Sequence, residues 1–354
     1  MTKRFLASGV FACALALAHA HAAGQAQAPA KAPAITPAKA PATTAAKPAA
    51  APAAPIRPWT SPRTADGQPD LQGYWSYATI TPLERPNAQG GKSVLTNEEV
   101  VEVNEEYDTL ADRRVGVGTD ADVALAYNQF WWDRGKSTGR TSLIVDPENG
   151  KLPPLTAEAQ KRIAAKAAYQ RAHPSDSAAD RNLQERCIMY HGVPPLPTGY
   201  NNHYQIFQTA KSVAILDENI HDVRTIPVDG RPHLPSDMRQ WLGDSRGHWE
   251  GETLVVETTN YSDKTVLKFP MDGKTTRSVE RFTRVAPDRI DYRFTINDPA
   301  TYAKPWTAEL PLTRIKGPLF EYACHEGNYG MLGILSGARA QERAAEQAAK
   351  KGAK

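Results

Sequence analysis

The chain has 354 residues, of which 41% are hydrophobic, and a formal net charge of +3. Eleven of its 42 Lys and Arg residues, but only two of its 39 Asp and Glu residues, lie in 1–57 and 336–354. Residues 58–335 therefore carry a net charge of −6 and show no basic stripe with interleaved aromatic residues, which excludes nucleic acid as an expected partner. They are long enough to form one large domain with a substantial core.

The N-terminal segment has the features of a secretory signal. Lys3 and Arg4 precede an apolar run over 5–18, and small residues then offer A-x-A cleavage sites, so we predict a signal peptide at 1–22. No second stretch is apolar enough to cross a membrane, and we expect no stable membrane insertion after cleavage. A periplasmic or secreted location follows. An Ala/Pro-rich linker over 23–57 and a charged, Ala-rich C-terminal tail over 336–354 flank the domain.

Two cysteines, Cys187 and Cys324, remain after signal cleavage. An exported protein with two cysteines usually pairs them, so we predict a disulfide between these residues. Two buried thiols are the alternative.

Two helices are expected within a helical and loop insertion over about 95–175. The first, over 95–114, begins with Thr96 and Glu99 at the spacing of a capping box. The second lies over 154–174, with Thr156 as its N-cap. Both are highly charged, so we place them on the surface.

Strand patterns occupy most of the remaining chain. In 288–298 the residues Ile290, Tyr292, Phe294 and Ile296 alternate with polar ones, and 306–315 repeats this pattern. The other expected strands are 70–77, 141–145, 204–208, 212–218, 222–228, 247–249, 253–261, 277–285 and 319–324. Short connections between them indicate antiparallel neighbours. We therefore predict a mainly β protein, an antiparallel β-barrel or strongly bent sandwich with two peripheral helices and long loops.

Longer blocks of sequence add a resemblance. Gly73 and Trp75 form the G-x-W pattern of lipocalin-like barrels at their first strand, which implies a similar architecture. The blocks "DGQPDLQGYW" (66–75), "RPHLPSDMRQWLGDSRGHWEGETLVVETTN" (231–260) and "YACHEGNYG" (322–330) resemble a family of secreted bacterial proteins to which no activity is attached. This second resemblance therefore implies no function.

Histidines suggest where chemistry takes place, because six of the nine lie between 191 and 325 beside other polar residues. Imidazoles titrate near neutral pH and arginine can clamp a carboxylate or enolate. We expect five candidate catalytic residues to lie close together at the mouth of the barrel: His203, His221, His248, Arg239 and Asp244. Candidate substrate-binding residues are Tyr200, Asn201, Asn202, Trp241, Trp249, His325 and Glu326.

Two other interpretations of these histidines stay open. Zinc or another divalent metal could be held by His203, His221 and His248, although no known ligand motif is present and we expect no cofactor. The histidines could also serve only as hydrogen-bonded structural residues.

The expected function is an exported, cofactor-independent enzyme that acts by acid–base chemistry on a small organic or sugar-derived substrate. A lyase or isomerase is preferred to a hydrolase. The alternative is a non-catalytic periplasmic binding protein for an apolar or aromatic small molecule, with a deep cavity lined by Tyr292, Phe294 and Leu310. An envelope structural protein is a third class. The oligomeric state is left open.

Overall fold

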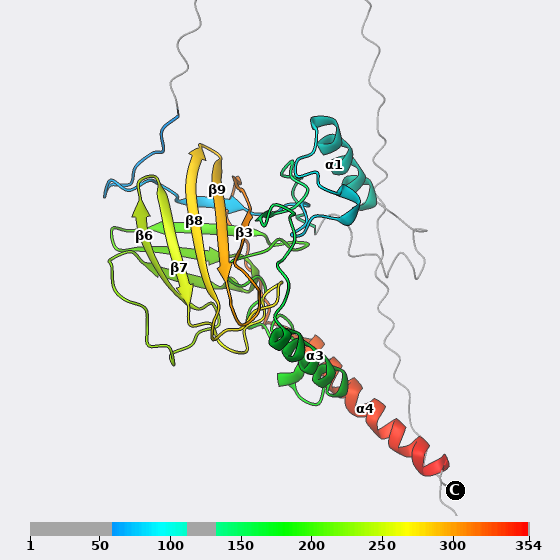
Figure 1. Ribbon diagram of the computed structural model, residues 1–354. Coiled ribbons are helices and arrows are strands. Elements are labelled where there is room, and N and C mark those ends of the chain that lie inside the picture. Colours follow the sequence, from blue (N-terminus) through cyan, green and yellow to red (C-terminus); the bar gives the residue numbers. More distant parts are fainter. Residues whose placement is uncertain (1–58, 112–131, 353–354) are drawn as a thin grey trace, which may run out of the picture. The chain divides into compact units, whose positions relative to one another are not determined.

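The computed structural model describes residues 59–111 and 132–352 (Figure 1). The expected signal peptide (1–22) and linker (23–57) lie outside these residues. The described part is mainly antiparallel β-structure with three α-helices, as predicted for the fold class.

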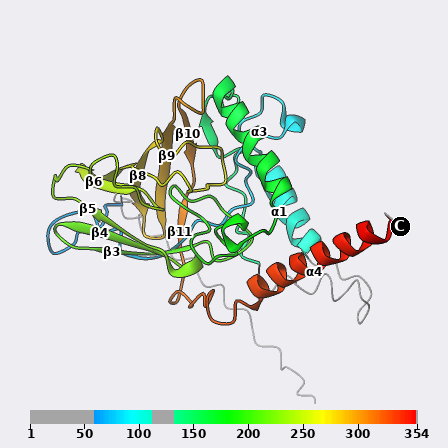
Figure 2. The ribbon, with the colours of Figure 1, turned by 90° about the horizontal axis from the view of Figure 1, so that it is seen from below.

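Nine strands form one continuous antiparallel sheet in the order β5-β4-β3-β1-β11-β9-β8-β7-β6. β10 extends it by pairing with β9 and with β2. β3, β4 and β5 run across the direction of β8, β9 and β10 (Figure 2), so the sheet curls over its own apolar face. The strands are β1 (Gly73–Ser76), β2 (Ile144–Asp146), β3 (His203–Gln208), β4 (Ser212–Asp217), β5 (Val223–Pro227), β6 (Asp244–Glu250), β7 (Thr253–Thr259), β8 (Arg277–Ala286), β9 (Arg289–Asn297), β10 (Trp306–Glu309) and β11 (Leu312–Arg314).

The two ends of the curled sheet meet where β6 approaches β5. Gly247 allows this approach, because a Cβ atom at this position would lie 2.9 Å from side-chain atoms of both Ile226 and Val228. A glycine permits closer contact between backbones than any other residue. The sheet is thereby nearly closed into a barrel.

The interior of the barrel is packed with large side chains. As expected from the alternation in 288–298, Ile290, Tyr292, Phe294 and Ile296 are at most 1% exposed. Trp306 contacts Phe294 edge-on, with ring centroids 5.7 Å apart. Burying each of these aromatic side chains contributes about 1.5–3 kcal/mol to folding. The apolar faces therefore account for the closure of the sheet.

The strand predictions need three corrections. The pattern over 306–315 forms two strands, β10 and β11, separated by Leu310 and Pro311. Proline lacks the N–H that would continue the hydrogen-bond ladder. Both strands pair with β9, but on the other side the partner changes from β2 for β10 to β1 for β11. The segment 319–324 is not a strand, and the strand expected at 247–249 is the longer β6.

Helices α1 (Asn97–Ala111) and α3 (Ala157–Ala172) begin where the sequence predicts. Thr96 and Glu99 form the expected reciprocal capping bonds, of 2.7 and 3.3 Å. Thr156 Oγ1 accepts a bond from the Ala159 N–H at 3.1 Å. These caps satisfy N–H groups that have no partner within a helix.

The C-terminal helix α4 (Tyr329–Gly352) is longer than the predicted tail, because it begins before residue 336. The remaining short helices are η1 (Asn87–Gln89), η3 (Ala178–Asp180) and η4 (Asn219–His221). None of the helices in the described residues is long and apolar enough to cross a membrane.

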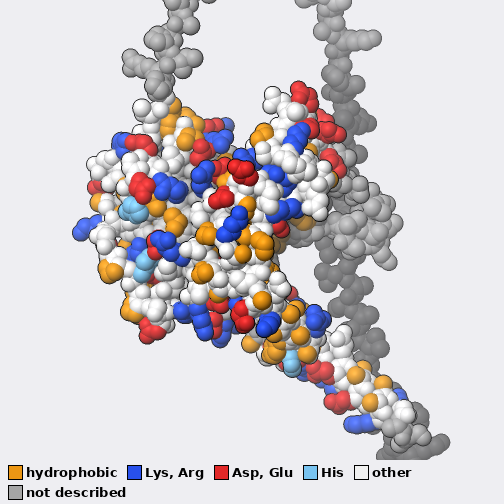
Figure 3. Space-filling model, viewed as in Figure 1, with side chains coloured by type: hydrophobic (Ala, Val, Ile, Leu, Met, Phe, Trp, Pro, Cys, Tyr) orange, Lys and Arg blue, Asp and Glu red, His pale blue; other side chains and the backbone are white. Residues whose placement is uncertain are grey.

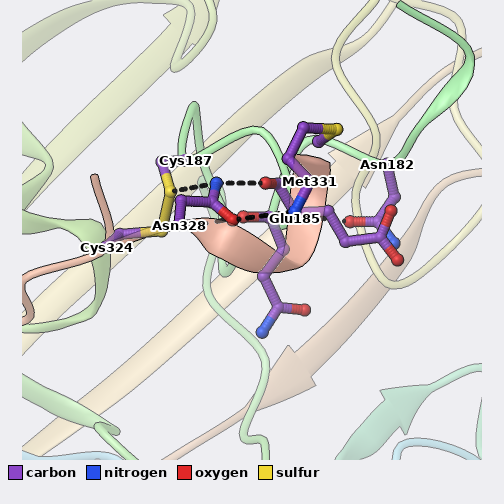
Figure 4. Close-up of a disulfide and its surroundings, with 7 residues drawn as sticks. Asn182, Glu185, Cys187, Cys324, Asn328 and Met331 are labelled. Carbon is purple, nitrogen blue, oxygen red and sulfur yellow. Dashed lines mark hydrogen bonds between the residues drawn. A yellow bond between two sulfur atoms is a disulfide. The ribbon is translucent and has the colours of Figure 1, made fainter. Parts of the chain in front are cut away.

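The predicted disulfide joins Cys187 to Cys324. Asn328 lies beside it and donates from Nδ2 to the Glu185 carbonyl at 2.9 Å (Figure 4). The same side chain accepts a bond from the Met331 N–H at 3.3 Å. The bridge and Asn328 together attach the start of α4 to the loop at 185–187.

Candidate ligand-binding groove

His203, at the start of β3, lies between two carboxylates. Its Nδ1 is 2.6 Å from Glu218 Oε2, and its Nε2 is 3.0 Å from Asp133 Oδ2. Glu218 Oε1 also accepts a bond from the Phe320 N–H at 2.9 Å. His203 therefore links three segments that are far apart in sequence.

Partial burial lowers the pKa of His203, but hydrogen bonds and Coulomb attraction to Asp133 and Glu218 outweigh it and raise the pKa to about 9. The ring is consequently a cation at neutral pH. A group in this state donates hydrogen bonds and is a poor general base near pH 7.

Three other candidate catalytic residues, His248, Arg239 and Asp244, bond to other partners than His203 does. His248 is exposed on β6, with Nε2 3.1 Å from Glu250 Oε1. Arg239 donates to two backbone carbonyls, those of Tyr261 and Gly273, at 3.1 and 2.8 Å. His221 ends η4, and its side chain lies outside the described residues.

Asp244, at the start of β6, is a buried acceptor. It lies 2.7 Å from His233 Nδ1 and also accepts bonds from the Leu234 N–H and from Arg246 Nη1, at 3.0 and 2.6 Å. These bonds attach the loop before β6 to the barrel. His233 was not among the predicted site residues, although its position eleven residues before Asp244 is compatible with such a loop contact.

The candidate substrate-binding residues are also distributed over several elements. Asn202 is fully buried and bonds to backbone groups of Asp133 and Thr198, while Trp241 and Trp249 pack against the core. Asn201 interacts with Glu218, and Tyr200 precedes it in the loop before β3. His325 and Glu326 are exposed in the loop before α4.

Charged side chains lie inside the barrel, which the prediction did not include. Arg224 of β5 donates to Glu280 of β8, with Nη2 3.2 Å from Oε1, and the Tyr292 hydroxyl donates to the same oxygen at 2.8 Å. Arg224 shares a strand face with Ile226, and Glu280 shares one with Phe282. A charge on an apolar strand face was the available sequence signal for this buried pair.

The space beside this pair is small. A cavity of about 10 Å³, the room of about one water molecule, is lined in part by Asp217, Asp222 and Arg224. Burial, and then the nearby Asp217 carboxylate, raise the pKa of Asp222 to about 7. The deep apolar cavity expected for a carrier is replaced here by packed side chains, since Tyr292, Phe294 and Leu310 are at most 1% exposed.

A much larger hollow of about 540 Å³ lies on the outer face of β8, β9 and the β10–β11 connection. Its size falls within the range of small-molecule sites. Basic and acidic side chains gather over β8 and β9 on this face (Figure 3). The charged residues that line the hollow, hereafter the groove, are Lys136, Arg140, Arg281, Arg289, Arg293, Asp291 and Glu309.

The floor of the groove brings two arginines side by side. Arg281 of β8 is directly opposite Arg293 of β9, and like charges in this position destabilise a sheet. Each has one carboxylate partner: Arg281 Nη2 donates to Glu250 at 2.7 Å, and Arg293 Nε donates to Glu309 at 3.0 Å. These bonds hold both guanidinium groups in place while leaving some of their five N–H donors for a ligand.

The rim of the groove contains Lys136 and Arg140 in a loop beside β1. Thr79 Oγ1 donates to the Lys136 carbonyl at 2.6 Å, which fixes this loop. Arg140 Nε is buried and has no hydrogen-bond partner among the described residues.

The remaining polar lining consists of hydroxyl side chains. Hydroxyl oxygens can accept a bond from a ligand, whereas the arginines and the lysine only donate. The proton of Thr79 is already donated to the Lys136 carbonyl, and the Thr283 hydroxyl is 2.7 Å from that of Thr253. The hydroxyl residues of the lining are Thr79, Ser137, Thr138, Thr283 and Thr313. The groove is therefore suited to a ligand that has both negative charges and hydroxyl groups.

Among the described residues, no group of three or more His, Cys, Asp or Glu side chains is arranged so that it could hold a metal ion. No family model matches this sequence, and neither a curated protein nor a solved structure is significantly similar to it. The geometry of the groove is therefore the basis for inferring a function.

Proposed function

We propose that this chain is an exported binding protein for an anionic, hydroxyl-bearing small molecule of the sugar-acid type. The observation that carries this proposal is the groove, whose lining contains five basic and two acidic side chains, with Arg281 directly opposite Arg293. Two of the basic side chains also pair with carboxylates outside the lining, Lys136 with Asp108 and Arg281 with Glu250. Guanidinium groups recognise carboxylates through paired N–H donors. The proposal keeps the binding-protein class expected as an alternative but replaces the apolar ligand with an anionic one.

The disulfide supports the export part of the proposal. Such bonds persist in oxidising compartments, and Cys187–Cys324 attaches the start of α4 to the domain. Acid–base catalysis by His203, His221, His248, Arg239 and Asp244 stays a prediction. It has less support than binding because His203 is already protonated at neutral pH and Arg239 is occupied by carbonyl groups.

Isothermal titration calorimetry at low ionic strength tests the binding proposal, with trigalacturonate as probe and its fully methyl-esterified form as the neutral control. We expect the acid to bind and the ester to bind at least tenfold more weakly. Added salt should weaken binding, because these charges are accessible to solvent.

Binding of the acid should require the two arginines on the floor of the groove, Arg281 and Arg293. The double substitution Arg281→Gln/Arg293→Gln should reduce the affinity at least tenfold. Arg277→Gln is the matched control, since Arg277 is on the outer face of β8, pairs with Glu257 and does not line the groove. Equal affinity of acid and ester, or an unchanged affinity in the double variant, would refute the proposal.

A further inference from the structure

The outer face of β9 alternates in charge along the groove. Arg289, Asp291 and Arg293 project from this face, while Ile290 and Tyr292 between them are buried. A strand rises about 3.3–3.4 Å per residue, so the Cα atoms of the two arginines are about 13 Å apart. Two positive positions are thus separated by a negative one.

The neighbouring strands reinforce this order. Each of these three β9 residues, together with the residues opposite it on the neighbouring strands, is here called a level. At the first level, Arg293 lies opposite Arg281 of β8 on one side and Glu309 of β10 on the other. At the middle level Asp291 is opposite Thr283, and its Oδ1 accepts a bond from Arg289 Nε at 2.6 Å. This level therefore presents a hydroxyl and a carboxylate that is already paired with the arginine of the next level.

The third level contains Arg289, which is opposite Thr313 of β11. Its bond to Asp291 is made by Nε, so the Nη groups keep N–H donors for a ligand. A ligand that matches all three levels has an acidic group at each end and an uncharged, hydroxyl-bearing unit between them. A span of about 13 Å is too long for a single sugar ring and suits a short chain of linked rings.

We infer that the groove takes a linear oligosaccharide with acidic groups on alternate sugars, an inference that rests on the proposed function and specifies its ligand. The acidic sugars lie at Arg281 with Arg293 and at Arg289, and the neutral sugar lies at Asp291. Lys136 and Arg140 add two basic side chains at the rim.

A single-stranded nucleic acid is a poorer match to the same groove. Proteins that bind such strands stack bases on exposed aromatic rings. The aromatic residue in the lining is Tyr292, which is 1% exposed and directs its hydroxyl to Glu280 in the barrel interior. The Thr283 hydroxyl and the Asp291 carboxylate at the middle level instead suit the hydroxyl groups of a sugar.

Calorimetry with defined oligosaccharides tests this inference. The probes are glucuronate, oligomers of two, four and six sugars that alternate glucuronate with N-acetylglucosamine, and galacturonate oligomers of the same lengths, which are acidic at every sugar. We expect the affinity for the alternating series to rise at least tenfold from glucuronate to the tetrasaccharide. The alternating tetrasaccharide should bind at least fivefold more tightly than tetragalacturonate.

Asp291→Asn removes the negative charge of the middle level. It should reduce the preference for the alternating tetrasaccharide to twofold or less, mainly through tighter binding of tetragalacturonate. Circular dichroism and the urea midpoint check that the variant is folded. Arg277→Gln should leave the preference unchanged.

The outcomes separate this inference from the proposed function. Both series could bind with affinities that depend on Arg281 and Arg293, yet show no preference for the alternating series or no increase with oligomer length. In that case the alternating ligand is refuted, while the proposed anion-binding groove stands. If neither series binds, both are refuted. An unchanged preference in Asp291→Asn also refutes the assignment of the neutral sugar to the middle level.

Discussion

Substituting Arg224 in the barrel interior should lower the free energy of unfolding far more than substituting an exposed arginine of the same barrel. Arg224 and Glu280 have side chains that are 7% and 0% exposed. In Arg224→Met, the carboxylate of Glu280 keeps the hydroxyl of Tyr292 as a donor but loses its charged partner. Leaving a buried charge without its partner costs about 3–5 kcal/mol of folding free energy.

Urea unfolding followed by tryptophan fluorescence measures this cost, because Trp75 and Trp306 are fully buried in the same core. With a denaturant dependence of about 3 kcal/mol per molar, the midpoint should fall by about 1–2 M urea. The control Arg277→Met removes an exposed arginine whose side chain is 48% exposed, and it should cost no more than about 1 kcal/mol.

A double variant separates the unpaired charge from lost packing. Arg224→Met/Glu280→Gln is neutral and keeps an acceptor for Tyr292, so it should be about 2 kcal/mol more stable than Arg224→Met. Protonation removes the charge of an unpaired buried carboxylate, so the cost of Arg224→Met should be smaller at pH 5 than at pH 8. A single variant that costs under about 1 kcal/mol, or a double variant no more stable than the single one, would refute the buried pair.

Two further predictions concern stability. His203→Gln should cost about 2–3 kcal/mol at or below pH 6.5, and the cost should disappear as the pH rises through about 9, because the raised pKa of His203 stabilises the fold only while the ring is protonated. Urea titrations from pH 6 to 10 measure this, and a constant cost would contradict it. Cys187→Ser/Cys324→Ser should lose up to roughly 5 kcal/mol by chain entropy, since the bridge spans 137 residues. If the oxidised and the reduced wild-type proteins unfold at the same urea concentration, the disulfide does not stabilise the fold.

Local signals in the sequence were sufficient for most of the fold. The two-residue alternation of 288–298 identified both the strand and its buried face, and Thr96 and Thr156 marked the starts of two helices. The disulfide followed from there being only two cysteines outside the expected signal peptide. The same alternation predicted one strand over 306–315, whereas Pro311 interrupts the hydrogen-bond ladder and the segment forms two strands, β10 and β11.

The groove and the buried ion pair, by contrast, were decided by tertiary structure. Arg281 and Arg293 look like ordinary surface residues in the sequence, and only the register of β8 against β9 places them opposite each other. Arg224 and Glu280 are 56 residues apart and meet because the sheet closes. Periodicity tells which face a side chain occupies, and a hairpin turn can set the register of two adjacent strands. Which distant strands face each other across the barrel depends on the strand order of the closed sheet, which no local pattern contains.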